Sequence, residues 1–268
     1  MDALKEIVPG KITRNVSYGP HARQVANVAV PESVDNQTKW VLIVHGGGWR
    51  YGNKSWMDGI QKMLYRKGLA SFNINYRLAG EGVRYREQLE DVTLAVQMLE
   101  KVMQQFGNSS AYFLLGESAG GHLALLYGYQ HPAKIAGIIS LSSPTDFYTQ
   151  TYFESPFYKA SRNIVEQITG ARLDQPADAE IFKQASPLFH IQPVPTLLFQ
   201  GTKDRAVDMS QATTLAAALE AQGVPHQLVL MKGAGHVPRL LPWKSPAIYR
   251  HIYTWILDHS PQLPSATP

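Results

Sequence analysis

A serine between two glycines is the first residue of this sequence with the setting of a nucleophile. Ser118 is the centre of a G-x-S-x-G pattern that runs from Gly116 to Gly120. An apolar run over 111–115 precedes it, and a helix-like segment over 121–130 follows. A buried strand, a sharp turn and a helix form the context in which this pattern presents a serine for attack on acyl groups. Glycine is favoured at both flanks because side chains there would collide as strand and helix converge.

A serine hydroxyl is a weak nucleophile and needs a base within hydrogen-bond reach. Nine histidines are available, and His236 is the best placed. It follows an expected strand over 226–231, in a loop of small residues that lets its side chain reach over the sheet edge. His122 is closer to Ser118 in sequence, but it lies one turn into the following helix. We therefore expect His122 to pack in the interior.

The base needs a third group to orient it, and Asp204 is the leading candidate. It follows an expected strand over 196–200, one strand before the histidine loop, which gives the chain order Ser, Asp, His. Two alternatives remain open. Asp146 follows the strand after the nucleophile, where some hydrolases place their acid, and Asp208 could instead cap the next helix.

A run of glycines supplies donors for a developing negative charge. His45-Gly46-Gly47-Gly48 comes directly after an apolar run over 40–44. Consecutive glycines let the main chain turn its N–H groups toward a ligand. Together with the N–H of Ala119, this loop is expected to form an oxyanion hole. No Lys-Ser or Lys-Thr pair follows in Walker spacing, which argues against a phosphate cradle.

Alternating strands and helices must hold these residues in place. An amphipathic helix is expected to begin at Ser55, with Ser55 as its cap and Trp56 on its apolar face. Further amphipathic helices are expected over 85–106, 121–130, 210–222 and the segment after Pro246. The expected strands are 13–17, 24–29, 40–44, 70–74, 111–115, 135–141, 196–200 and 226–231. This alternation predicts an α/β fold with a doubly wound, mostly parallel eight-stranded sheet. Because ligands bind at the carboxyl ends of such strands, Ser118, Asp204 and His236 can converge.

Residues 142–195 interrupt the alternation with aromatic and turn residues. A structureless loop of that length is improbable in a compact domain, so we expect a small cap-like insertion with short helices near 161–169 and 178–184. Its aromatic residues could line the acyl or alcohol pocket, or simply pack against the sheet. We expect residues 1–268 to form a single domain with a frayed Pro/Ser/Thr-rich tail over 261–268.

Composition narrows the class of protein. The chain has 268 residues, of which 44% are hydrophobic, as in ordinary globular proteins. The net charge of +4 comes from scattered residues without a basic stripe, so no nucleic-acid partner is expected. There are no cysteines, which excludes disulfides and cysteine nucleophiles. The polar N-terminus and the lack of a membrane-length apolar run predict a soluble, cytoplasmic protein with no membrane partner, either a monomer or a homodimer.

Five segments together resemble the α/β-hydrolase superfamily: 45–49, 75–78, 116–121, 201–207 and 235–236. Within it they are similar to the small H-G-G-G-W carboxylesterases related to hormone-sensitive lipase, and to arylformamidases. The resemblance spans roughly 40–256. Two features depart from the pattern: only about 39 residues precede the first central strand, and Glu117 replaces the commoner aspartate before the nucleophile.

The resemblance implies roles for individual residues. It implies Ser118 as nucleophile, His236 as base, Asp204 as acid, and Gly46, Gly47 and Ala119 as oxyanion donors. It also implies a structural pair between Arg77 and an acid such as Asp91.

The function expected from these residues is a serine hydrolase that cleaves small-molecule carboxylic esters through an acyl-enzyme on Ser118. Neither a metal nor an organic cofactor is expected. An amidase acting on arylformamides similar to N-formyl-kynurenine is the alternative, because the same triad and glycine loop serve both reactions. A catalytically inactive scaffold that binds a partner is the alternative outside enzymes.

Overall fold

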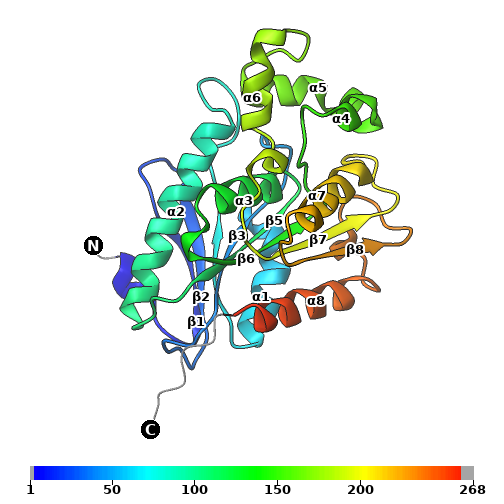
Figure 1. Cartoon of the computed structure of the whole chain (residues 1–268). Helices are drawn as coiled ribbons and strands as arrows, with labels where there is room; N and C mark the ends of the chain where they lie inside the picture. The colour runs from blue at the N-terminus through cyan, green and yellow to red at the C-terminus, as the bar shows by residue number, and fades with distance from the viewer. Residues whose placement is uncertain (1–2, 261–268) are drawn as a thin grey trace.

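An eight-stranded sheet forms the centre of the protein in the computed structural model, which describes residues 3–260 (Figure 1). The strand order is β1-β2-β4-β3-β5-β6-β7-β8. β1 and β2, and β2 and β4, pair antiparallel, and the other neighbours pair parallel. The strands are β1 (Lys11–Ser17), β2 (Val25–Val30), β3 (Trp40–Val44), β4 (Ala70–Ile74), β5 (Tyr112–Glu117), β6 (Ile135–Leu141), β7 (Thr196–Gly201) and β8 (His226–Met231). The predicted mostly parallel, eight-stranded α/β sheet is confirmed.

Helices cover both faces of this sheet (Figure 1). The first face is covered by α1 (Asp58–Arg66) and α8 (Ser245–Asp258). The second is covered by α2 (Tyr85–Gln105), α3 (Ala119–Gln130) and α7 (Met209–Ala221). Short 3-10 helices lie at η1 (Ala3–Glu6), η2 (Lys54–Met57), η3 (Pro132–Lys134), η4 (Pro176–Asp178), η5 (Pro187–His190) and η6 (Pro238–Leu240).

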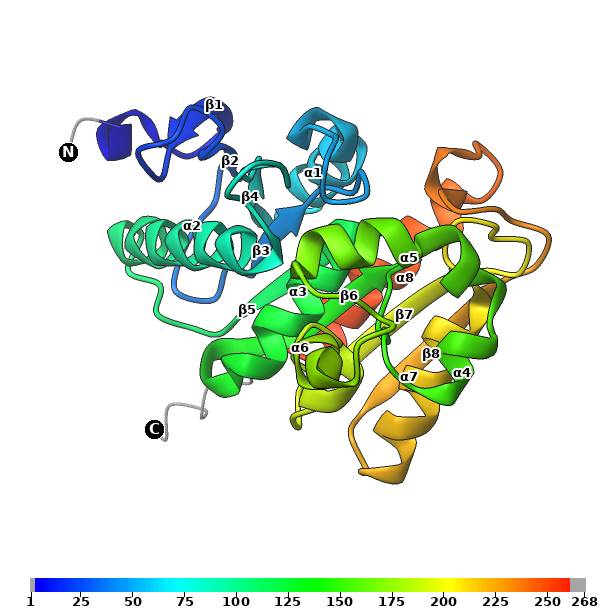
Figure 2. The same cartoon turned by 90° about the horizontal axis from the view of Figure 1, so that it is seen from above.

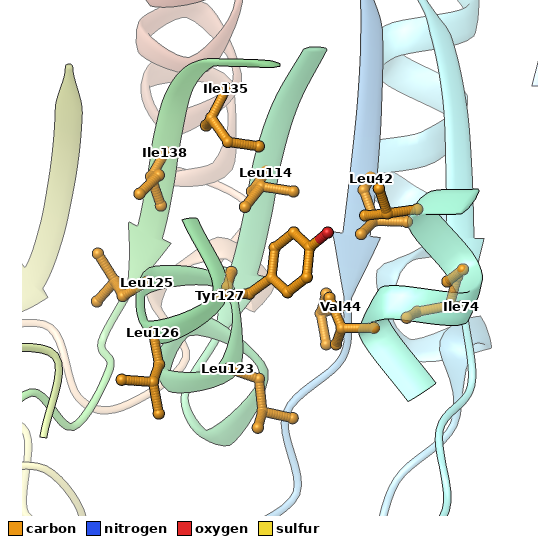
Figure 3. Close-up of a cluster of buried hydrophobic side chains, with 14 of the residues drawn as sticks. Leu42, Val44, Ile74, Leu114, Leu123, Leu125, Leu126, Tyr127, Ile135 and Ile138 are labelled. Atoms are coloured by element: carbon orange, nitrogen blue, oxygen red, sulfur yellow. The ribbon is translucent and has the colours of Figure 1, made fainter. Parts of the chain in front are cut away.

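Burial on both faces explains why the central strands are continuous apolar runs. In β3, Leu42 and Val44 belong to the core on the α3 side, while Val41 and Ile43 belong to the core on the α1 side. Strands buried on two faces lose the alternation of a half-exposed strand. Figure 3 shows Tyr127 of α3 among Leu42, Val44 and other aliphatic side chains of the strands. α3 is itself buried nearly all round, as a core helix should be.

The segment over 142–195 connects β6 to β7 and contains three α-helices in addition to η4 and η5. These are α4 (Gln150–Glu154), α5 (Pro156–Thr169) and α6 (Ala179–Gln184), grouped at the top of the view in Figure 1. The short helices predicted near 161–169 and 178–184 correspond to α5 and α6. Several of its aromatic side chains, including Phe147 and Tyr152, are buried against one another. The expected frayed tail over 261–268 lies outside the described residues.

The predicted pair between Arg77 and Asp91 is confirmed. Arg77 follows β4, and its Nε donates to the buried Asp91 carboxylate over 2.8 Å. Its main-chain N–H donates to the other carboxylate oxygen over 2.6 Å. These bonds fasten the loop after β4 onto α2. Across residues 3–260, no helix has the length and apolar character needed to cross a membrane.

Candidate active site

The turn between β5 and α3 holds Ser118 in an uncommon backbone conformation. Its φ of 53° and ψ of −123° lie where non-glycine residues are rare, at a cost of about 1–3 kcal/mol. The flanking glycines make the turn possible. A Cβ on Gly116 would stand 2.3 Å from the carbonyl oxygen of Gly120, and one on Gly120 would stand 2.3 Å from that of Val44. The predicted need for glycine at both positions is confirmed.

The structure brings Ser118, His236 and Asp204 into one hydrogen-bonded chain. The Ser118 Oγ lies 2.9 Å from Nε2 of His236. The Nδ1 of the same ring lies 2.8 Å from Oδ2 of Asp204. With Asp204 accepting from Nδ1–H, Nε2 is free to accept from the serine hydroxyl. The Asp204 side chain is fully buried, whereas that of His236 is 25% exposed and open to an incoming molecule.

Asp204 is held as a carboxylate by a set of donors. Its Oδ1 accepts from the N–H groups of Ala206 and Val207, each over 2.9 Å. Burial raises the pKa of Asp204, but hydrogen bonds from His236 and Val207 outweigh it and keep the pKa below its usual value. Gln200 adds a donor to Oδ2 over 3.1 Å. We did not predict this role for Gln200, although a glutamine in an otherwise apolar strand is a recognisable signal.

The two alternative acids serve local structure. The Asp146 carboxylate accepts from the N–H groups of Tyr148 and Thr149 and from the Thr149 hydroxyl, in the turn that leads into α4. Asp208 accepts from the N–H of Ser210 and so caps α7. Neither carboxylate contacts His236 within the described part of the chain.

The glycine loop after β3 lies against the serine turn. A Cβ on Gly46 would stand 3.2 Å from that of Ser118. Gly47 has a φ of 125°, and a Cβ there would stand 2.2 Å from the carbonyl oxygen of Tyr51. Between residues 3 and 260, no hydrogen bond uses the N–H of Gly46 or Gly47. Ala119 is the first residue of α3, so its N–H has no partner within the helix. All three predicted oxyanion donors therefore retain free N–H groups beside Ser118.

A buried histidine links the glycine loop to the insertion. The indole N–H of Trp49 donates to Nδ1 of His122 over 3.1 Å, and Nε2 of that ring donates to the carbonyl oxygen of Ala185 over 2.7 Å. Burial lowers the pKa of His122 to about 4, so the ring is neutral near pH 7. The expectation that His122 packs in the interior is confirmed.

An unpredicted ion pair joins the serine turn to the histidine loop. Arg239, in η6, donates from Nε to one Glu117 oxygen over 2.6 Å and from Nη2 to the other over 2.7 Å. Both side chains are 5% exposed. Glu117 precedes the serine and Arg239 follows His236 by three residues, so the pair fastens the two halves of the site together. Nothing in the local sequence indicates which acid Arg239 would meet.

A pocket of about 480 Å³ opens beside Ser118. Its lining comes from the glycine loop and η2 on one side and from the serine turn and histidine loop on the other: Gly46, Gly47, Gly48, Trp56, Glu117, Ser118, His236, Val237, Arg239 and Leu240. No residue of the 142–195 insertion is among them. In Figure 2, the orange loop after β8 lies apart from the segment around α1.

The expected helix start at Ser55 was wrong. Asn53 is the cap instead, because its side chain accepts from the N–H of Ser55 over 3.0 Å, and a 3-10 turn precedes α1. That turn rotates Trp56 out of the core, and 50% of the residue is exposed. Trp56 therefore becomes a wall of the pocket rather than part of the helix's apolar face.

The model of the BD-FAE family matches residues 26–219, which include the glycine loop, Ser118 and Asp204. The chain belongs to the BD-FAE family. His236 lies beyond the matched range. Its contacts with Ser118 and Asp204 are seen in the structure of this BD-FAE chain.

Individual proteins similar to this BD-FAE chain include two curated relatives and a solved structure. A probable isoprenylcysteine alpha-carbonyl methylesterase, ICMEL2 of Arabidopsis thaliana, is 23% identical over 248 residues, covering 86% of this chain and 58% of the relative. The chain thus spans little more than half of that relative's length. Kynurenine formamidase of Danio rerio is 27% identical over 154 residues, covering 53% of this chain and 50% of the relative.

The structure of esterase B from Lactobacillus Rhamnosis superimposes with a TM-score of 0.75 at 21% identity. The match covers 96% of this chain and 90% of that one. This likeness concerns the fold, and the BD-FAE chain accordingly has the α/β-hydrolase fold that its sequence predicts.

Proposed function

We propose that this protein is a carboxylesterase-type serine hydrolase that forms an acyl-enzyme on Ser118. The observation that carries the proposal is the chain of contacts from Ser118 through His236 to Asp204, at 2.9 and 2.8 Å. These distances fall within the range required of a nucleophile, its base and an orienting acid. The similarity to a methylesterase is a second line of support.

Acylation begins when Nε2 of His236 takes the hydroxyl proton as Ser118 Oγ attacks the acyl carbon of the ester. The carbonyl oxygen becomes an oxyanion that accepts hydrogen bonds from the N–H groups of Gly46, Gly47 and Ala119. Removing one donor of this kind typically slows a hydrolase by about 10²–10³-fold. The imidazolium, stabilised by the Asp204 carboxylate, then gives its proton to the alcohol oxygen, which leaves as the C–O bond breaks.

Deacylation repeats the sequence with water. His236 removes a proton from the water as its oxygen attacks the acyl carbon, and the same N–H groups hold the second oxyanion. His236 then returns the proton to Ser118 Oγ as the acyl–serine bond breaks. The products are a carboxylic acid, an alcohol and the enzyme in its starting protonation state.

Within this proposal, residues 1–268 act as one hydrolase domain in which the 142–195 insertion forms a cap-like cover beside the site. The contact from Ala185 through His122 to Trp49 supports this arrangement, because it connects the insertion to the glycine loop.

Replacing the nucleophile tests the proposal. Ser118→Ala should abolish hydrolysis of p-nitrophenyl acetate while the thermal unfolding transition is retained. Substantial residual turnover in the folded variant would reject Ser118 as nucleophile. Covalent labelling of Ser118 by a fluorophosphonate separates an active hydrolase from an inactive scaffold, because only an activated serine reacts at an appreciable rate.

Arylformamide hydrolysis is the second candidate function. The similarity to kynurenine formamidase favours it. The same groups would serve, with His236 protonating a leaving amine in place of an alcohol. Comparing kcat/KM for N-formyl-kynurenine with that for p-nitrophenyl acetate decides between the two: a higher value for the formamide would make the amidase the main activity.

A further inference from the structure

The walls of the pocket beside Ser118 are apolar and face each other from two segments. Trp56 comes from η2, while Val237 and Leu240 come from the loop after β8. Trp56 and Leu240 are 50% and 66% exposed, so both retain apolar surface that a bound molecule could cover. Burial of such surface is the main source of affinity for uncharged groups.

Trp56 is held in place before any ligand binds. Its main-chain N–H donates to the carbonyl oxygen of Asn53 over 2.9 Å, which fixes the backbone that carries the side chain. Its ring meets the buried His45 ring edge-on, with 6.4 Å between centroids. A wall that is already ordered loses little conformational entropy on binding.

The charged groups in the lining neutralise each other. Glu117 and Arg239 form the bidentate pair described above, at 2.6 and 2.7 Å. An exposed indole face attracts a cation only modestly by itself, and an unpaired carboxylate nearby would strengthen that attraction. Here the carboxylate is already occupied by Arg239, and the Arg239 cation is likewise satisfied. The pocket therefore offers no uncompensated charge to a ligand.

The position of His236 indicates which half of an ester the pocket receives. In the proposed mechanism, Nε2 of His236 delivers a proton to the leaving oxygen, so the alcohol half must lie on the side of that ring. Val237 and Leu240 follow His236 on the same loop. The walls that they form therefore border the leaving alcohol.

We propose that this pocket binds the alcohol half of the ester and selects an uncharged, apolar alcohol, with Trp56 and Leu240 as the selecting side chains. The inference rests on the proposed esterase function and adds the class of its alcohol. The volume of about 480 Å³ falls within the range of small-molecule sites.

A series of acetates tests the apolar walls. Ethyl, butyl and hexyl acetate share one acyl group and have leaving alcohols of similar basicity. In the wild type, kcat/KM should rise by about fourfold for each methylene buried until the pocket is filled. Trp56→Ala and Leu240→Ala should each lower kcat/KM for hexyl acetate by about tenfold more than they lower it for ethyl acetate. Trp243→Ala is the matched control, because Trp243 is 74% exposed and outside the pocket.

A pair of acetates of equal shape tests the charge argument. The acetate ester of choline carries a quaternary ammonium group, and 3,3-dimethylbutyl acetate replaces its nitrogen with carbon. After division by the rate of each ester with hydroxide in solution, kcat/KM should be at least about tenfold higher for the uncharged ester, since a desolvated cation finds no counter-charge in the pocket. Equal values, or a preference for the cation, would overturn the selection of uncharged alcohols.

A third series separates the two halves of the ester. Methyl acetate, butyrate and hexanoate vary the acyl group alone, and both wall variants should leave their relative rates unchanged. A loss confined to the longer acyl groups would assign the pocket to the acyl half and overturn the inference. Wild-type rates that do not depend on the alcohol would overturn it while leaving the esterase proposal intact. If the wild type hydrolyses no ester in any series, the esterase proposal itself fails and the inference fails with it.

Discussion

Removing the arginine of the buried ion pair should destabilise the protein strongly. Arg239→Met keeps a side chain of similar length but leaves the Glu117 carboxylate unpaired at 5% exposure. Breaking a buried pair from one side typically costs about 3–5 kcal/mol, because an uncompensated charge stays in the interior. Since domains of this kind have a free energy of unfolding of about 5–15 kcal/mol, the variant should fold but unfold at a lower urea concentration.

The double variant Glu117→Gln/Arg239→Met separates the cost of an unpaired charge from the loss of packing. It removes both charges, so it should recover most of the lost stability. Urea unfolding at pH 7, followed by circular dichroism, gives the free energies of the parent and both variants. Arg77→Gln is a control elsewhere in the fold, because it removes the positive charge beside a fully buried acid, Asp91, which keeps hydrogen bonds from Gln24 and from the main-chain N–H of residue 77. It should destabilise the protein without changing the chemistry at Ser118.

The activity of the same variants tests whether the pair positions the histidine. Arg239 lies three residues after His236, whose Nε2 must stay 2.9 Å from Ser118 Oγ. A displacement of about 1 Å can cost on the order of 10²-fold in rate. We expect both Arg239 variants to lose about 10–100-fold in kcat at 25 °C, measured on the folded protein, and Arg77→Gln to lose little. An Arg239→Met protein within about 0.5 kcal/mol of the parent, or a double variant no more stable than the single one, would refute this account.

Three further outcomes are expected. Asp204→Asn should lower kcat by about 10³–10⁴-fold, because the charge that orients His236 is lost. Asp146→Asn should change kcat little, because its carboxylate accepts hydrogen bonds within a turn. The reverse result in steady-state kinetics would move the acid to Asp146. Gly120→Ala should lower the free energy of unfolding by at least about 1–3 kcal/mol, since its Cβ would stand 2.3 Å from main-chain oxygens. Gly80→Ala should not lower it, because the space around Gly80 is open. Equal urea midpoints for the two variants would contradict the steric argument. Burial lowers the pKa of both His122 and His45 to about 4 in the folded protein, against about 6.5 in the unfolded chain, so the unfolded state binds more protons between these pH values. Each histidine should lower the free energy of unfolding by about 1.4 kcal/mol per unit as pH drops through that window. Equal stability at pH 7 and pH 5 would contradict this.

Local requirements made the strands, the turns and the three reacting residues predictable from sequence. Runs such as Trp40–Val44 have to be buried on both faces, which fixes them as central strands. The turn at Ser118 has room only for glycine at positions 116 and 120. The G-x-S-x-G pattern therefore predicts the geometry of the turn directly from the residue types. Asp204 and His236 follow consecutive strands of a parallel sheet, which brings their loops to one edge. The cellular location and the oligomeric state stay predictions from the sequence.

Only the tertiary structure decided what surrounds those residues. Sequence left Asp146 open as the acid, and the hydrogen bond from His236 goes to Asp204. The partner of Glu117 is an arginine 122 residues away, and Trp56 lines the pocket although helical spacing placed it with the core. Spacing along a chain determines what a turn or strand requires of its own residues. Which distant side chains meet depends on how separate elements are rotated and packed, and that is determined by the fold as a whole.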